Sequence, residues 1–263
     1  MKRDYILELN MGPLATDFSI NGVPLLRHRV PRDSNYSELL NPWLVRGTNQ
    51  VELTVDILAI NPDWPPQHAA YAQDATRHKV SATITAAGVT PLWEGRFPAD
   101  QVQGNILPLT VASRTFSVDD DLPAWAWLGR PVQPYSPQIE RDLFAAFMEN
   151  YTAFLKRDVS RLMALGAVRY REFATAFREP VDAYTAASEK DWRAVFEEHE
   201  PRAWPKMTSP DDLVFTPCWN GALYRINPLN GVSPLTTIPS KSGMVVEFDV
   251  YLGNVNGSWT WVR

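Results

Sequence analysis

Four Asn-Gly pairs stand beside apolar, strand-like stretches, and they constrain the fold of this chain more than any other feature. They are Asn21-Gly22, Asn220-Gly221, Asn230-Gly231 and Asn256-Gly257. Both residues of such a pair tolerate a positive φ angle, so the pair favours the tight turn of a β-hairpin. We therefore expect antiparallel strands near both ends of the chain.

The first 115 residues contain stretches in which apolar and polar residues alternate. The clearest begins at Gln50 and places Val51, Leu53, Val55 and Ile57 on one face. This alternation is typical of a half-buried antiparallel strand. Further strands are predicted within 5–9, 17–26, 79–86, 91–97 and 106–111. We expect an all-β sandwich domain over residues 1–115.

Helical signals begin at Ser136, a suitable N-cap residue with Pro137 after it. A second helix is expected to start at Asp158 or Ser160 and to stop at Pro180, and a third to open at 188–191, which has capping-box spacing. Beyond residue 210 the pattern indicates strands, the longest over 244–252. We expect an α+β domain over residues 136–263.

A Pro/Trp-rich linker is predicted at 116–135, and it carries Trp125 and Trp127. A linker that lacks Gly and Ser runs is stiff. We expect both indoles to be buried at the joint between the domains and to border a ligand site. The opposing interpretation leaves both indoles exposed, ready to dock an external partner.

The segments 20–23, Ile-Asn-Gly-Val, and 44–51, Leu-Val-Arg-Gly-Thr-Asn-Gln-Val, resemble the jelly-roll "galactose-binding-like" sandwiches. The resemblance implies that Gly47 takes a turn and that the Asn49 side chain closes it. Many members of that class bind carbohydrate, whereas others are structural modules.

The segments 151–162 and 256–261 resemble the first helices and the closing strand of the NTF2-like (SnoaL-like) superfamily. The resemblance implies a cone of helices packed on an antiparallel sheet. Catalytic members typically use Asp and His from helix and strand. The second half of this chain offers only His199, within a charged segment at a helix end. This departure favours a protein without catalytic activity.

The net charge of −5 and the pI of about 5.4 argue against nucleic-acid binding, which needs clustered Lys and Arg. The single cysteine cannot form an intrachain disulfide. No run approaches the ~20 apolar residues of a membrane span. We therefore expect a soluble, cytoplasmic protein, with a periplasmic one as the alternative if a signal peptide has been removed.

The sequence predicts no catalytic residue, no cofactor and no metal site. The four histidines, His28, His68, His78 and His199, lack the spacing of metal ligands, and Cys218 in a predicted strand suits a small buried hydrophobe. In the strand 244–252, the polar face holds Glu247, Asp249 and Tyr251, and the opposite face is apolar. We expect these three residues to form an outward interface for a partner or a homodimer.

These observations favour a non-catalytic interaction protein that binds a protein partner, as an adaptor or an immunity-like inhibitor. Ten tryptophans support this interpretation, because indoles are enriched at interfaces. The first alternative is a carbohydrate- or small-ligand-binding protein in which Trp43, Trp64 and Trp93 stack on sugar rings. The second alternative is an NTF2-like lyase or isomerase.

Overall fold

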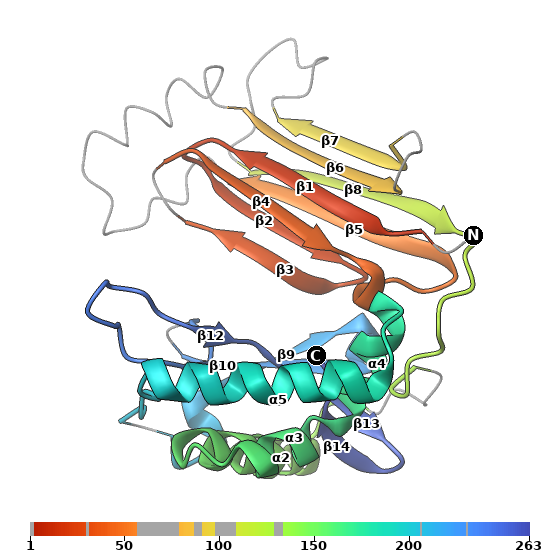
Figure 1. Cartoon of the computed structure of the whole chain (residues 1–263). Coiled ribbons are helices and arrows are strands. Elements are labelled where there is room, and N and C mark those ends of the chain that lie inside the picture. The colour runs from red at the N-terminus through yellow and green to blue at the C-terminus, as the bar shows by residue number, and fades with distance from the viewer. Residues whose placement is uncertain are drawn as a thin grey trace. The chain divides into compact units, whose positions relative to one another are not determined.

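The chain divides into two compact units, residues 1–122 and 123–263, which are drawn in Figure 1. The computed structural model describes residues 3–29, 32–56, 79–86, 91–97, 109–128, 134–205, 207–229 and 231–263. No helix among these residues is both long and apolar enough to cross a membrane. Every sheet found in the described ranges lies within one unit.

The first unit is all-β, as predicted, and its strands form two four-stranded antiparallel sheets that face each other (Figure 1). One sheet has the order β4-β1-β6-β7 and the other the order β3-β2-β5-β8. The strands are β1 (Tyr5–Met11), β2 (Ala15–Ile20), β3 (Val23–His28), β4 (Ser34–Leu39), β5 (Gly47–Asp56), β6 (Val80–Ala86), β7 (Trp93–Phe97) and β8 (Leu109–Val118). A short 3₁₀ turn, η1 (Asn41–Trp43), precedes β5.

The inner faces of the two sheets make the core of this unit. In β5, Val51, Leu53 and Val55 are buried, which confirms the face predicted from their alternation. Phe18 of one sheet lies 5.9 Å, centroid to centroid, from the indole of Trp93 in the other sheet. This inter-sheet contact buries large apolar area, the main favourable contribution to folding.

Two turns of the first unit interlock through asparagine side chains, and one of them is the turn at Gly47 that the sequence predicts. Gly47 has a φ of +95°, a conformation that favours glycine, and Asn49 closes the turn. The Asn49 Oδ1 accepts from the Val45 N–H at 2.9 Å, and its Nδ2 donates to the Val45 carbonyl at 2.8 Å. The Asn21 Nδ2 also donates to Asn49 Oδ1, at 2.9 Å, and so ties the β2–β3 hairpin to this turn.

The second unit is α+β, as predicted, with helices followed by antiparallel strands. Its helices are α2 (Pro137–Leu155), α3 (Val159–Leu165), α4 (Ala167–Phe177) and α5 (Val181–Glu198). The strands β9 (Leu213–Cys218), β10 (Leu223–Pro228), β13 (Val250–Val255) and β14 (Ser258–Trp261) form one sheet of order β14-β13-β10-β9. β11 (Leu235–Thr236) and β12 (Glu247–Phe248) pair separately, and two 3₁₀ turns, η3 (Pro210–Asp212) and η4 (Trp219–Gly221), flank β9.

Two helix starts are confirmed by their caps. The Ser136 hydroxyl accepts from the Ile139 N–H at 3.3 Å, and the Asp158 carboxylate accepts from the Arg161 N–H at 2.9 Å. The predicted start of the third helix at 188–191 is wrong, because α5 begins at Val181 and Ser188 lies in its interior. Pro180 is the N-cap residue of α5, with φ −58° and ψ 130°, and its side chain makes no cap hydrogen bond.

The helices and the sheet share one apolar core. Phe147, Tyr151 and Leu162 are buried in it, and Phe248 packs against it 4.2 Å from the ring of Trp192, as the helical and strand patterns predict. The single strand expected over 244–252 is wrong. β12 pairs with β11, whereas β13 pairs with β10 and β14, so the backbone changes partners at Asp249.

The expected linker begins inside a strand, since β8 continues to Val118, and residues from Pro123 onward belong to the second unit. Trp125 and Trp127 are both buried, which confirms the prediction of burial. The Arg263 guanidinium lies 4.7 Å from the ring centroid of Trp125 and 5.4 Å from that of Trp127. These contacts fix the segment on the second unit.

A buried ion pair completes this arrangement. The Arg263 Nη1 donates to the Glu172 Oε2 at 2.5 Å, and the Ala126 N–H donates to the other carboxylate oxygen, also at 2.5 Å. Both side chains are buried, and Phe173 places its ring 5.4 Å from the Arg263 guanidinium. Glu172 of α4, the segment around Ala126 and Arg263, two residues after β14, therefore meet at one point.

We expect Asn49→Ala to destabilise the first unit by about 1–3 kcal/mol, because it leaves the partly buried backbone groups of Val45 without their side-chain partner. The exposed Asn35 of β4 supplies a matched control, and Asn35→Ala should change stability by about 0.5 kcal/mol or less. Urea denaturation followed by tryptophan fluorescence measures both. Equal midpoints for the two variants would contradict the role of Asn49.

We expect Arg263→Met to destabilise the second unit by about 3–5 kcal/mol, because the Glu172 carboxylate then remains buried without its counter-charge. Glu172→Met should cost a similar amount, since it leaves the Arg263 charge unpaired. The double variant should recover much of the loss, because apolar side chains replace both charges. Chemical denaturation of the four proteins gives the coupling energy, and additive losses would show that the two groups do not interact.

Candidate functional site

A hairpin arm, residues 235–248, provides the first candidate site in the second unit. β11 and β12 form its base, with Leu235 opposite Phe248 and Thr236 opposite Glu247. The tip closes where the Ser240 N–H donates to the Met244 carbonyl at 2.8 Å. Gly243 allows this closure with a φ of +80°.

The base of the hairpin arm is fixed to the chain that follows α5. The Ile238 N–H donates to the Glu200 carbonyl at 2.7 Å, and the Arg202 N–H donates to the Thr236 carbonyl at 2.8 Å. Leu235 is buried, and Phe248 packs on Trp192. The arm is therefore anchored by both backbone hydrogen bonds and apolar packing.

The tip of the arm exposes apolar side chains. Ile238 is 45% exposed, Met244 59% and Val245 39%. Leu229 and Val232 are exposed just before the arm, so residues 229–245 hold five of the nine large exposed hydrophobic residues among those described. Single exposed apolar residues are normal, but a cluster of them marks an interaction surface.

A cavity of about 700 Å³, the hairpin groove, lies between this tip and the end of α5. Its lining combines apolar, hydroxyl and charged residues: Glu198, His199, Glu200, Ile238, Pro239, Ser240, Lys241, Ser242 and Met244. His199 is buried, and its Nδ1 has no hydrogen-bond partner in the described part of the chain. The exposed carboxylates of Glu198 and Glu200 give the rim acidic character.

The hairpin groove offers both apolar surface and carboxylate acceptors. Apolar side chains can be covered by a partner, and the acidic rim can accept hydrogen bonds from a cationic side chain. No group of three His, Cys, Asp or Glu side chains that could hold a metal ion occurs among the described residues.

The tryptophans predicted to stack on sugars have different surroundings. Trp43 in η1 and Trp93 in β7 are both buried in the first unit, and Trp93 packs on Phe18. Trp64 lies outside the described residues, as do His68 and His78. Buried indole faces of this kind stabilise the sandwich and offer no open surface to a ligand.

Trp125 and Trp127 lie together against Arg263, and Trp127 also borders a second cavity of the same unit. The ligand site expected at the joint between the domains stays a prediction. Of the three residues predicted as an outward interface, Glu247 is exposed on the hairpin arm. Asp249 is half-buried and pairs with Arg225 at 3.1 Å, and Tyr251 is buried. The polar face of the predicted strand therefore contributes only Glu247 to the arm.

Sequence reasoning missed the exposed tip. Its signal is the run Pro239-Ser240-Lys241-Ser242-Gly243, which is rich in turn residues and lies between apolar Ile238 and Met244. Such a run indicates a loop with an apolar residue on each side. Only the structure shows that these two apolar side chains are exposed and face away from the core.

Cys218 is buried at the end of β9, and burial raises the pKa of its thiol to about 11. The thiol therefore stays protonated near neutral pH, and the thiolate is the nucleophilic form.

No protein-family model matches the chain, and no curated protein or solved structure with which it was compared matches it. The functional assignment therefore rests on the geometry of the described residues.

We expect Cys218 of the folded protein to react slowly with a disulfide reagent near neutral pH, and faster as the pH rises towards 11. The raised pKa lowers the thiolate fraction at any pH below it, and burial restricts access. Reaction rates of native and urea-unfolded protein test this expectation. Native reactivity equal to that of the unfolded chain would contradict the burial of Cys218.

Proposed function

We propose that this protein is a non-catalytic interaction protein that binds a polypeptide partner through the hairpin arm, as an adaptor or an immunity-like inhibitor. The observation that carries the proposal is the cluster of exposed apolar residues at the tip, on a base fixed by backbone hydrogen bonds. A fixed base limits the ordering cost of binding, because the surface is already held in place.

The lining of the hairpin groove suits a partner segment that carries one apolar anchor residue with a Lys or Arg beside it. Ile238 and Met244 offer the apolar contact, and methionine adapts its shape to an incoming side chain. Glu198 and Glu200 supply the complementary charge, although the Arg157 guanidinium lies 3.5 Å from Glu200. The net charge of −5 also favours encounter with a basic partner.

The packing of the second unit supports an adaptor rather than a lyase or isomerase. An enzyme of the NTF2-like class would need a polar pair deep in an apolar cup. Aromatic rings pack together between the helices and the sheet instead: Phe154 lies 5.6 Å from Phe196 and 6.3 Å from Phe248, and Trp192 lies 4.2 Å from Phe248.

We also propose a specific fold for each unit and a cytoplasmic location. Helices followed by an antiparallel sheet support an NTF2-like cone for the second unit. The Gly47 turn closed by Asn49 supports a jelly-roll, galactose-binding-like sandwich for the first. The single cysteine suits a reducing compartment.

We expect short peptides with one large apolar residue and one Lys or Arg to bind the full-length protein, and Met244→Asp to abolish this binding. The substitution places a charge where the apolar anchor would lie. Val181→Asp is the matched control, because Val181 is 41% exposed on α5 and should retain binding. A library of random peptides selected on the native protein, followed by calorimetry with each variant, measures both.

Light scattering of the same variants separates a second copy from a foreign partner. A dimer that Met244→Asp converts to a monomer would identify the occupant of the arm as another copy of this chain. Selected peptides that bind native protein and Met244→Asp equally would contradict the proposal.

A further inference from the structure

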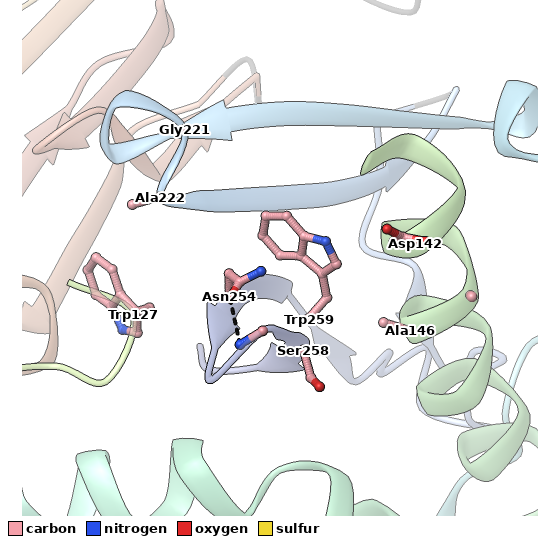
Figure 2. Close-up of a pocket in the computed structure, with 10 residues that line it drawn as sticks. Trp127, Asp142, Ala146, Gly221, Ala222, Asn254, Ser258 and Trp259 are labelled. Atoms are coloured by element: carbon pink, nitrogen blue, oxygen red, sulfur yellow. Dashed lines mark hydrogen bonds between the residues drawn. The ribbon is translucent and has the colours of Figure 1, made fainter. Parts of the chain in front are cut away.

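A second cavity, the Trp259 groove, opens in the second unit away from the hairpin arm, with a volume of about 690 Å³ (Figure 2). Four separate segments line it: Trp127; Asp142, Ala145 and Ala146 of α2; Gly221 and Ala222 before β10; and Asn254, Gly257, Ser258 and Trp259 around the β13–β14 turn. None of the described residues lines both this groove and the hairpin groove.

Trp259 supplies an aromatic surface to the groove. It lies on β14 two residues before Trp261, which is buried in the core, whereas Trp259 is half-buried. Tyr224 supports its ring edge-on at 5.5 Å between centroids. The aromatic core of the unit therefore continues outward to a ring that a ligand can reach.

Polar groups surround this ring. Figure 2 shows the Asp142 carboxyl group and the Trp259 indole pointing toward one another across the groove. One Asp142 oxygen accepts from the Gln138 Nε2 at 2.7 Å, which orients the carboxylate. A carboxylate offers further lone pairs, so Asp142 can still accept hydrogen bonds from a ligand.

Asn254, near the end of β13, completes the polar set. The Asn254 Oδ1 accepts from the Gly257 N–H at 3.1 Å, which holds the amide in place and leaves its NH₂ group to donate. Asn256 and Gly257 take positive φ angles of 54° and 88°, so the chain reverses tightly and Trp259 pairs with Asn254 on the neighbouring strand.

Small residues keep the groove open. Ala145, Ala146, Gly221, Ala222 and Gly257 all line it, and none carries a side chain larger than a methyl group. A flat ligand can therefore reach the Trp259 ring from the side of α2.

We propose that the Trp259 groove binds a saccharide, with a pyranose ring stacked on Trp259 and its hydroxyl groups held by Asp142 and Asn254. A pyranose has a face of C–H groups and an edge of hydroxyls that both donate and accept. The groove matches both, with an aromatic face beside a carboxylate acceptor and an amide donor. A purely apolar ligand would leave these polar groups unpaired, which costs free energy.

Binding of neutral oligosaccharides to the full-length protein tests the proposal. The probes are di- and trisaccharides of glucose, galactose and N-acetylglucosamine, measured by saturation-transfer NMR and calorimetry. At least one should bind and quench Trp fluorescence. Trp259→Ala should weaken its binding about tenfold or more, equal to about 1.4 kcal/mol, whereas Trp259→Phe should retain part of it.

Two exposed positions keep the test decisive if Trp259→Ala fails to fold. Asp142→Asn should weaken binding, and Ala145→Trp should block the groove, whereas Glu149→Gln on the same helix should leave binding unchanged. Met244→Asp at the hairpin arm should also leave it unchanged, which separates this site from the proposed partner surface. Failure of every saccharide to bind, or equal binding by the native protein and a folded Ala145→Trp variant, would overturn the proposal.

Discussion

The buried ion pair between Glu172 and Arg263 is the constraint on which the second unit depends. Burial lowers the pKa of the Arg263 guanidinium to about 10, although the Glu172 carboxylate acts in the opposite direction. Desolvation of the cation is therefore the larger effect, and the surroundings must compensate for it. They do so with the Ala126 N–H bond to Glu172 and with the ring faces of Trp125 and Trp127. This arrangement also sets the position of Trp127 at the border of the Trp259 groove.

The sequence predicted correctly those turns and helix caps that depend on residues close together in the chain. The Asn49 turn, the Ser136 cap and the Asp158 cap each involve partners within four residues, so their motifs could be read directly. The ion pair could not, because its partners are 91 positions apart and neither has a local signature. The strand expected over 244–252 failed for the same reason: its alternation is continuous, but its pairing partners change at Asp249.

The candidate sites also depend on residues that are far apart in the chain, so the sequence did not predict them. Tryptophan content suggested aromatic interfaces, yet Trp43, Trp93 and Trp125 are buried, because a large indole gains most by leaving water. Ile238 and Met244 are exposed instead, and their signal in the sequence is only the turn-rich run 239–243 between them. Trp259 was predicted as part of a closing strand, but its reach into a cavity depends on small residues far away in sequence, at Ala145 and Gly221.

The two proposed sites use different chemistry because the structure around them differs. At the hairpin arm, the backbone is paired at the base and the exposed groups are aliphatic, so burial of apolar area is the main interaction a partner can gain. At the Trp259 groove, an aromatic ring stands beside an oriented carboxylate and an oriented amide. A ligand there can gain directional hydrogen bonds as well as burial of apolar area. The segment that carries Glu247 and Phe248 in β12 continues into β13 and ends near Asn254. The same stretch of chain thus contributes to the proposed polypeptide surface at one end and to the proposed saccharide groove at the other.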